Sequence, residues 1–248
     1  MAIDMIHSIT PLDMTIKIVI IPDIHHDYLT AEKIIKKENP DKIIFLGDYF
    51  DDFDDIIQDT INTAKWLKKS LQQENRIHLI GNHDLSYMTD NPNLKCAGYR
   101  TDKHKTIKEQ NIDWNKLKMY HFIDEKWLCT HAGFSNDFFK QQHVKKSDSI
   151  QKVLDFSKKD LEKIDDENHN HPFFQVGFTR GGSNDMGGPL WCDYSEFVDI
   201  PGVNQIFGHT PNHVVRQQKT KNSEHYCIDT KLKHYAIYQK NKIMIVEL

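Results

Sequence analysis

The chain has 248 residues, of which 38% are hydrophobic, so it is long enough to build a substantial core. Its 36 acidic and 32 basic residues give a net charge of -4, which argues against a broad basic surface for nucleic-acid backbones. No apolar stretch reaches the length of a membrane span, and the acidic N-terminal residues are unlike a signal peptide. The four cysteines form no CxxC pair, so we expect reduced thiols. Together with the N-terminal sequence and the lack of a long apolar stretch, this predicts a cytoplasmic protein without membrane contact.

The first 80 residues alternate short apolar runs with helical patterns. The apolar runs are short and partly β-branched, as in buried strands, whereas the helical segments repeat apolar residues at steps of three and four. Strands are predicted at 16–21, 42–46 and 76–80, and helices at 28–38 and 53–71. A strand–helix–strand order of this kind favours parallel βαβ units.

The rest of the chain has a weaker pattern that ends in strands. Short helices and loops are expected over 84–118, an antiparallel pair at 120–124 and 126–129, a helix between 147 and 164, a polar loop at 165–172 and a glycine-rich loop at 174–189. Further strands are expected at 205–207, 213–216, 226–228, 235–238 and 243–246. We therefore predict a single α/β domain over residues 1–248, in which sheets carry the core and helices cover them.

Potential metal ligands follow each of the first three predicted strands. These clusters are Asp23-Ile24-His25, Gly47-Asp48-Tyr49-Phe50-Asp51 and Gly81-Asn82-His83-Asp84. His131 and His209 each follow a later strand-like run. Because ligands bind outside the carboxyl ends of parallel strands, we expect these side chains to meet in one crevice. Mixed imidazole and carboxylate ligands suit first-row metals such as Mn, Fe, Co or Zn.

These five motifs resemble, in order and spacing, those of the calcineurin-like metallophosphoesterase family. The resemblance extends from the first strand to Pro211. It implies a four-layer αββα sandwich, with two mixed sheets packed together between helical layers. It also implies a phosphoester hydrolase with two divalent metal ions, for which we expect manganese, with Fe, Zn, Co or Ni as alternatives.

The resemblance also implies a role for each matching residue. Asp23 and His25 would bind the first metal, and Asp48 would bridge both metals. The second metal would be bound by Asn82, His131 and His209. His83 would act as general acid or as a charge stabiliser at the leaving oxygen, oriented by Asp51, while a hydroxide bridging the metals attacks phosphorus.

Two departures from the family pattern bear on the substrate. Pro211 stands where many phosphodiesterases of the family have a second histidine, which favours the protein-phosphatase and diadenosine-tetraphosphatase branches. Those branches usually have a phosphate-binding arginine after the second motif, but here Asp52 stands there. Arg180, in the glycine-rich loop, is the predicted substitute, and Asn82 and His26 are further predicted substrate contacts.

The expected substrates are phosphomonoesters, nucleotide or dinucleotide polyphosphates, or a phosphoprotein. A phosphodiesterase or nuclease of the same superfamily is the nearest alternative, followed by a non-catalytic binding module on this fold. The remaining acids of the second motif, Asp52, Asp54 and Asp55, are interpreted as helix-start residues that interact with the helix dipole.

Overall fold

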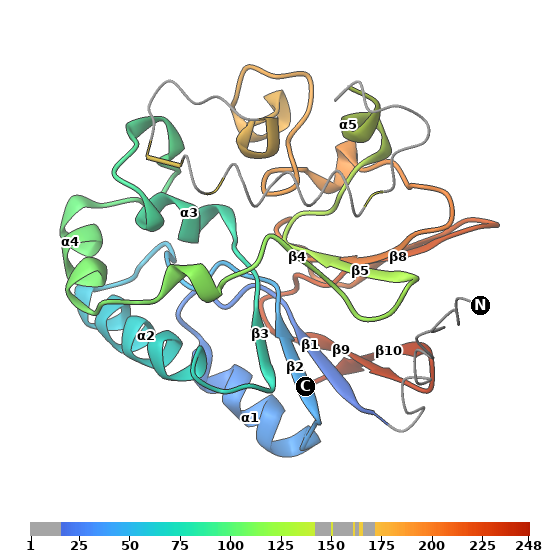
Figure 1. Cartoon of the computed structure of the whole chain (residues 1–248), viewed down its shortest axis with the longest axis horizontal. Coiled ribbons are helices and arrows are strands. Elements are labelled where there is room, and N and C mark those ends of the chain that lie inside the picture. Colours follow the sequence, from blue (N-terminus) through green and yellow to red (C-terminus); the bar gives the residue numbers. More distant parts are fainter. Residues whose placement is uncertain (1–15, 142–149, 151–160, 162–163, 166–171) are drawn as a thin grey trace, which may run out of the picture.

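The computed structural model describes residues 16–141, 150, 161, 164–165 and 172–248 (Figure 1). Most of the helix expected between 147 and 164, and most of the loop expected at 165–172, lie outside the described residues. Among the described residues, no helix is both long and apolar enough to cross a membrane.

The described strands form two mixed sheets of five strands each. The first has the order β10-β9-β1-β2-β3, in which β1, β2 and β3 are parallel and β9 and β10 antiparallel. The second has the order β4-β5-β6-β8-β7, with β5, β6 and β8 parallel. The bounds are β1 Ile18–Ile21, β2 Lys42–Phe45, β3 Arg76–His78, β4 Tyr120–Phe122, β5 Trp127–Thr130, β6 Asn204–Phe207, β7 Arg216–Lys219, β8 Glu224–Cys227, β9 His234–Gln239 and β10 Lys242–Glu247.

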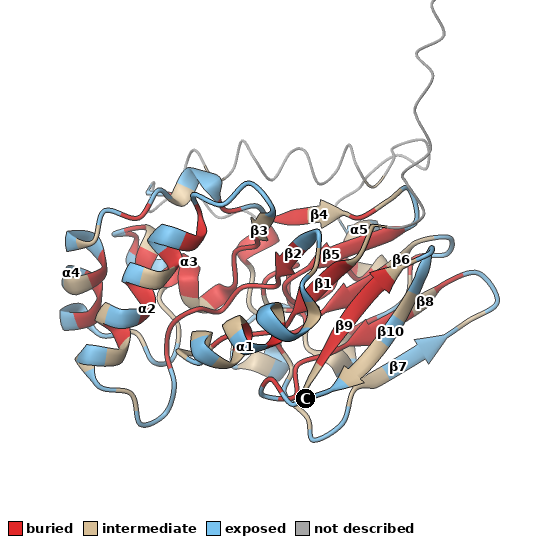
Figure 2. Cartoon of the chain, turned by 90° about the horizontal axis from the view of Figure 1, so that it is seen from below, coloured by how far each residue is buried: buried red, intermediate tan, exposed pale blue. Residues whose placement is uncertain are grey.

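The strand β1 is buried on both faces, which explains its continuous apolar sequence. Ile18 and Ile20 pack between the two sheets, in a cluster that includes Ile206 of the second sheet. Val19 and Ile21 belong to the cluster that the helices cover. Each such side chain contributes about 1.5–3 kcal/mol when it is fully buried. Figure 2 shows the central strands as buried and the helices as exposed on their outer sides.

Helices cover the outer faces of the sheets and complete a four-layer sandwich, as predicted (Figure 1). The α-helices are α1 Tyr28–Glu38, α2 Ile57–Ser70, α3 Asn82–Met88, α4 Thr101–Glu109 and α5 Asn136–Gln141. Short 3-10 turns lie at Pro92–Leu94, Trp114–Lys116, Pro172–Phe174, Phe178–Arg180 and Tyr194–Glu196. The layer outside the second sheet is thin, and Phe197 fixes it by packing against Phe207 with ring centroids 4.7 Å apart.

Two predictions of local structure were wrong, and one helix was not anticipated. The helix expected from Phe53 begins only at Ile57, and Phe53 is 98% exposed, because the acidic run before the helix forms a loop. The strand expected at 213–216 begins at Arg216, since β7 is an exposed edge strand whose polar sequence carries no apolar pattern. The helix α5, six residues long, was not predicted.

A buried carboxylate joins the ends of β2 and β3. Asp84 accepts hydrogen bonds from the backbone N–H groups of Asp48, Tyr49 and Gly81, each at 2.8 Å. Burial and the nearby Asp48 carboxylate raise the pKa of Asp84 to about 7, and the backbone donors of Gly81 and Tyr49 oppose this rise. Asp84 therefore holds the loop after β2 against the start of α3 and fixes Asp48 beside Asn82 and His83.

Candidate metal centre

The backbone turns sharply at several of the predicted site residues. His25, Asp48, Asp51 and His209 all have positive φ angles, of 39°, 49°, 67° and 67°. The left-handed region costs an ordinary residue roughly 1–2 kcal/mol, and residues held there cluster at functional sites. The turns direct these side chains toward the carboxyl ends of the parallel strands.

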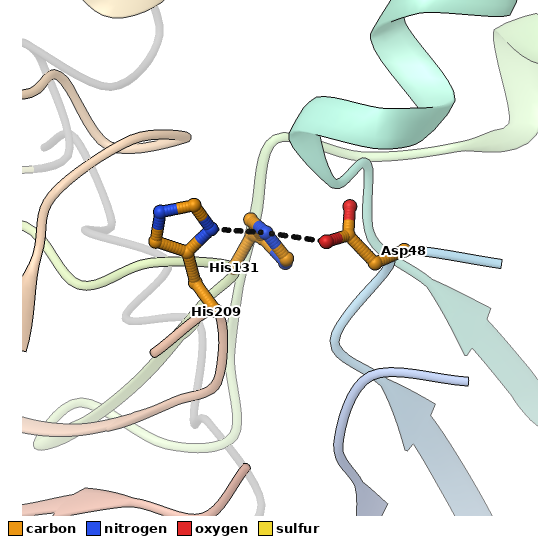
Figure 3. Close-up of side chains that lie close together, drawn as sticks. All are labelled: Asp48, His131 and His209. Carbon is orange, nitrogen blue, oxygen red and sulfur yellow. Dashed lines mark hydrogen bonds and ion pairs between the residues drawn. The ribbon is translucent and has the colours of Figure 1, made fainter. Parts of the chain in front are cut away.

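Three donor atoms from different segments surround Nε2 of His131, and Figure 3 shows two of the residues that supply them, Asp48 and His209. His131 Nε2 lies 3.0 Å from Asn82 Oδ1, 3.2 Å from His209 Nδ1 and 3.4 Å from Asp48 Oδ2. All four side chains are buried. The predicted ligands of the second metal therefore meet at one point in the interior.

A backbone carbonyl fixes the orientation of His131. Its Nδ1 lies 2.9 Å from the carbonyl oxygen of Leu46, which can only accept a hydrogen bond, so Nδ1 is the donor. In the neutral ring Nε2 then carries a lone pair and faces the lone pairs of its three neighbours. Metal-binding histidines are commonly held by such a bond from the other ring nitrogen.

The charges around the cluster favour a positive charge within it. Burial by itself would lower the pKa of His131, but the nearby carboxylates of Asp48 and Asp23 raise it to about 9. Burial and the neighbouring charges of His131 and Arg180 lower the pKa of His209 well below its usual value. A cation between these side chains would balance the carboxylates and attract all the facing lone pairs.

The distances fit a transition-metal ion. Nitrogen and oxygen ligands lie about 2.0–2.2 Å from such an ion, so neighbouring ligands of one ion are separated by roughly 3–3.5 Å. The measured separations of 3.0–3.4 Å fall in this range. Asp48, Asn82, His131 and His209 could therefore hold one divalent ion with little rearrangement.

A second group of possible ligands adjoins the first. His25 Nδ1 donates to the carbonyl oxygen of Asp51 at 2.6 Å, and its Nε2 lies 3.8 Å from Asp48 Oδ2. Asp23 accepts from the backbone N–H of His209 at 2.7 Å. Asp23, His25 and Asp48 could therefore contribute to a further cation site, with Asp48 between the two groups.

The sequence analysis did not identify Asp229, a buried carboxylate near this second group. Burial raises the pKa of Asp23, and the negative charge of Asp229 raises it further. Asp229 lies two residues after the end of β8, and His209 lies two residues after the end of β6. The two strands pair in parallel, with Phe207 opposite Cys227, so the two side chains lie at the same edge of the sheet. This spacing after a predicted strand was the available sequence signal.

His83 and Asp51 form a hydrogen-bonded pair beside the cluster. His83 Nδ1 lies 2.9 Å from Asp51 Oδ2, and the backbone N–H of His83 donates to Asp48 Oδ1 at 3.0 Å. Burial by itself would lower the pKa of His83, but Asp48 and Asp51 raise it well above its usual value. The His83 ring also packs edge-on against His25, with ring centroids 5.4 Å apart.

Arg180, a predicted substrate contact, lies next to the cluster. Its Nη2 donates to Thr210 Oγ1 at 2.8 Å and to the carbonyl oxygen of His209 at 3.3 Å. Its Nε lies 2.9 Å from Asp193 Oδ2, and its side chain is partly exposed. Trp191 packs edge-on against the His209 ring at 5.9 Å.

The interpretation of His26 as a substrate contact is corrected. Its Nδ1 lies 2.9 Å from Thr63 Oγ1 and its Nε2 lies 3.0 Å from Asp55 Oδ2, so other side chains engage both ring nitrogens. Asp55 is corrected as well, because its carboxylate also binds the buried ammonium group of Lys103 instead of acting at a helix start. These contacts join distant segments and leave no local sequence pattern.

Two glycines allow the loops after β2 and β3 to come close together. Gly47 has a φ of 105°, which favours glycine, and a Cβ there would lie 2.5 Å from the backbone nitrogen of Gly81. Gly81 has an ordinary φ of -100°, so a tight turn does not require it. Its role is close approach, because a Cβ there would lie 2.0 Å from Asp48 Oδ1.

A family model and several solved structures are similar to this chain. The family model of calcineurin-like phosphoesterases matches residues 16–213. A search of curated proteins gave no match. One similar solved structure is a serine/threonine phosphatase from Saccharomyces cerevisiae with similarity to human phosphatase PP5. It is 12% identical, the alignment covers 95% of this chain and 81% of that one, and the TM-score is 0.53.

Two further solved structures are similar at lower scores. A putative diadenosine tetraphosphatase is 14% identical over 95% of each chain, with a TM-score of 0.47. A metallophosphoesterase from Sphaerobacter thermophilus is 13% identical over 94% of this chain and 88% of that one, with a TM-score of 0.45. At such identities, the yeast phosphatase shows the shared fold alone.

The family match, the two packed sheets and the buried donor cluster define a metal-dependent phosphoester hydrolase. The chain belongs to the calcineurin-like phosphoesterase family, whose model covers most of its length.

The close approach at Gly81 predicts the effect of Gly81→Ala. The added methyl group would displace the Asp48 carboxylate, so we expect Mn²⁺ affinity to fall by roughly 10–100-fold, as when groups that orient metal ligands are lost. Titration calorimetry would measure it. Gly202→Ala is the control for a general loss of stability, because its φ of 89° strains an alanine there although a Cβ has no atom within 4 Å. Wild-type Mn²⁺ affinity in Gly81→Ala would contradict the account.

Proposed function

We propose that the protein is a dinuclear metal-dependent hydrolase of phosphomonoesters or of nucleotide and dinucleotide polyphosphates. The observation that carries the proposal is the convergence of Asp48, Asn82, His131 and His209 beside the His83–Asp51 pair. The first group can hold a cation, and the pair can deliver a proton a few ångströms away. Metal-assisted phosphoester hydrolysis uses both functions.

Each predicted ligand has a role in this proposal. Asp23 and His25 would hold the first ion, and Asp48 would contribute one carboxylate to both ions. Asn82, His131 and His209 would hold the second. The bound ions would lower the pKa of a water molecule and neutralise charge on the phosphoryl oxygens. Manganese is the proposed metal, since mixed N and O ligands accept it, and Fe, Zn, Co and Ni are alternatives.

His83 would protonate the leaving oxygen of the substrate. Its Nδ1 is held by Asp51 Oδ2, which directs Nε2 toward a bound ester. The carboxylates of Asp48 and Asp51 raise the pKa of His83 above its usual value, which favours the protonated ring. A protonated ring can donate its Nε2 proton as the ester bond breaks.

Arg180 and Asn82 would bind the substrate phosphate. The Arg180 guanidinium lies beside His209 and is partly exposed, so a phosphate at the metal centre could reach it. It would take the place of the arginine that is absent after Asp51. A guanidinium can bind the several unshared oxygens of a terminal phosphate, which supports phosphomonoesters and polyphosphates over internal diesters.

We also propose that the protein acts in the cytoplasm. All four cysteines are free thiols, and Cys129, Cys192 and Cys227 are buried, as expected for a reducing compartment.

The variant His83→Ala tests the proton donor. We expect turnover to fall by roughly 10²–10⁴-fold, the usual contribution of general acid–base catalysis, while Mn²⁺ binding persists. His213→Ala, which removes an exposed histidine, is the control. Unchanged turnover in His83→Ala would show that another group donates the proton.

The preferred ester is tested with two synthetic substrates. After removal of metal with a chelator and addition of Mn²⁺, we expect p-nitrophenyl phosphate to be hydrolysed faster than bis-p-nitrophenyl phosphate. The reason is that Arg180 would bind the terminal phosphate of a monoester better than the internal phosphate of a diester. Faster cleavage of the diester would favour a phosphodiesterase, and no metal-dependent cleavage of either ester would count against the proposed function.

A further inference from the structure

The helix α4 contains a buried lysine, Lys103, that contacts Asp51 of the candidate site. The side chain of Lys103 is only 2% exposed. Its Nζ donates to Asp51 Oδ1 at 2.8 Å, to Asp55 Oδ2 at 2.5 Å and to the carbonyl oxygen of Gly98 at 3.2 Å. All three protons of the ammonium group therefore have acceptors.

Stability alone does not account for this lysine. Removing an ammonium group from water costs several kcal/mol, and buried ion pairs can often be replaced by packed hydrophobic residues without loss of stability. What the ion pair adds here is a defined geometry at Asp51, the residue that contacts His83.

The two carboxylate oxygens of Asp51 contact different groups. Oδ1 accepts from Lys103 and, at 2.6 Å, from the hydroxyl group of Tyr87. Oδ2 faces His83 Nδ1 at 2.9 Å. The carboxylate cannot rotate away from His83 without breaking two bonds to Oδ1. The loop at Gly98 packs on the same side chain, since a Cβ at Gly98 would lie 3.0 Å from the Asp51 Cβ.

Asp55 holds the lysine from its other side. Its Oδ2 binds Lys103 and lies 3.0 Å from His26 Nε2, and its Oδ1 lies 3.5 Å from Arg100 Nη1. These contacts fix the position of Nζ between two carboxylates. A chain of contacts therefore runs from Asp55 through Lys103 and Asp51 to His83.

We propose that Lys103 is a positioning residue for the reaction, which holds Asp51 and thereby the His83 ring in the orientation that protonates the leaving oxygen. The inference rests on the proposed function. Within the described part of the chain, no hydrogen bond joins Lys103 to the predicted metal ligands, so its loss should leave metal binding intact.

The leaving group of the substrate gives a signature that a general loss of stability would not give. Phenolate is a stronger base than p-nitrophenolate, so hydrolysis of phenyl phosphate depends more on protonation of the leaving oxygen. A misplaced His83 ring should slow phenyl phosphate hydrolysis more than p-nitrophenyl phosphate hydrolysis.

The experiment compares kcat for the two esters in the Mn²⁺-loaded wild type, Lys103→Met and Lys108→Met. Because general acid catalysis contributes roughly 10²–10⁴-fold, we expect Lys103→Met to lower kcat for phenyl phosphate by about tenfold more than kcat for p-nitrophenyl phosphate. Mn²⁺ content should equal that of the wild type. Lys108, an exposed lysine on the same helix, should give the wild-type ratio.

A second variant covers the case in which Lys103→Met does not fold. Lys103→Gln combined with Asp55→Asn removes one positive and one negative charge, so the interior stays balanced, and it should show the same shift in the ratio. A wild-type ratio in either folded variant overturns the proposal. Failure of both variants to fold also overturns it, because Lys103 would then be a structural residue. A wild type without activity would instead refute the proposed function.

Discussion

The site depends on one physical constraint, which is that atoms bearing lone pairs face one another in a buried space. His131 Nε2 lies within 3.4 Å of an amide oxygen, a carboxylate oxygen and another imidazole nitrogen. Such an arrangement is repulsive without a proton or a cation between the atoms, and burial removes the water that would screen it. A divalent ion converts each of these contacts into a favourable one.

Backbone hydrogen bonds and backbone geometry hold these atoms in place. Asp84 ties the ends of β2 and β3 through three backbone hydrogen bonds, and Gly81 lets Asp48 approach. The backbones of Asp48 and His209 are held in the left-handed region. The strain of the loops is therefore offset by the two sheets, whose central strands, such as β1 and β5, are buried along their length. The ligands need little reorganisation to bind an ion, which favours both affinity and a defined geometry.

The sequence was sufficient to predict the strands that end at the site and the donors that follow them, because both leave short-range patterns. The short parallel strands predict a common edge, and Asp23, Asp48, Asn82, His131 and His209 lie there. It could not predict partners that depend on tertiary contacts. Lys103 lies 52 residues from Asp51, and nothing in the sequence of α4 distinguishes it from the exposed Lys108. Phe53 is a second example of a residue that the local pattern misplaced. Its spacing fits the apolar face of α2, but the helix begins only at Ile57 and Phe53 is exposed.

We propose that Asp48 lies between two divalent ions, and crystals grown with Mn²⁺ would reveal whether it does. Anomalous scattering at the manganese edge should give two peaks roughly 3.5–4 Å apart, one on each side of the Asp48 carboxylate, with His131 and His209 at one peak and His25 at the other. A single peak, or two peaks that do not share Asp48, would contradict the account.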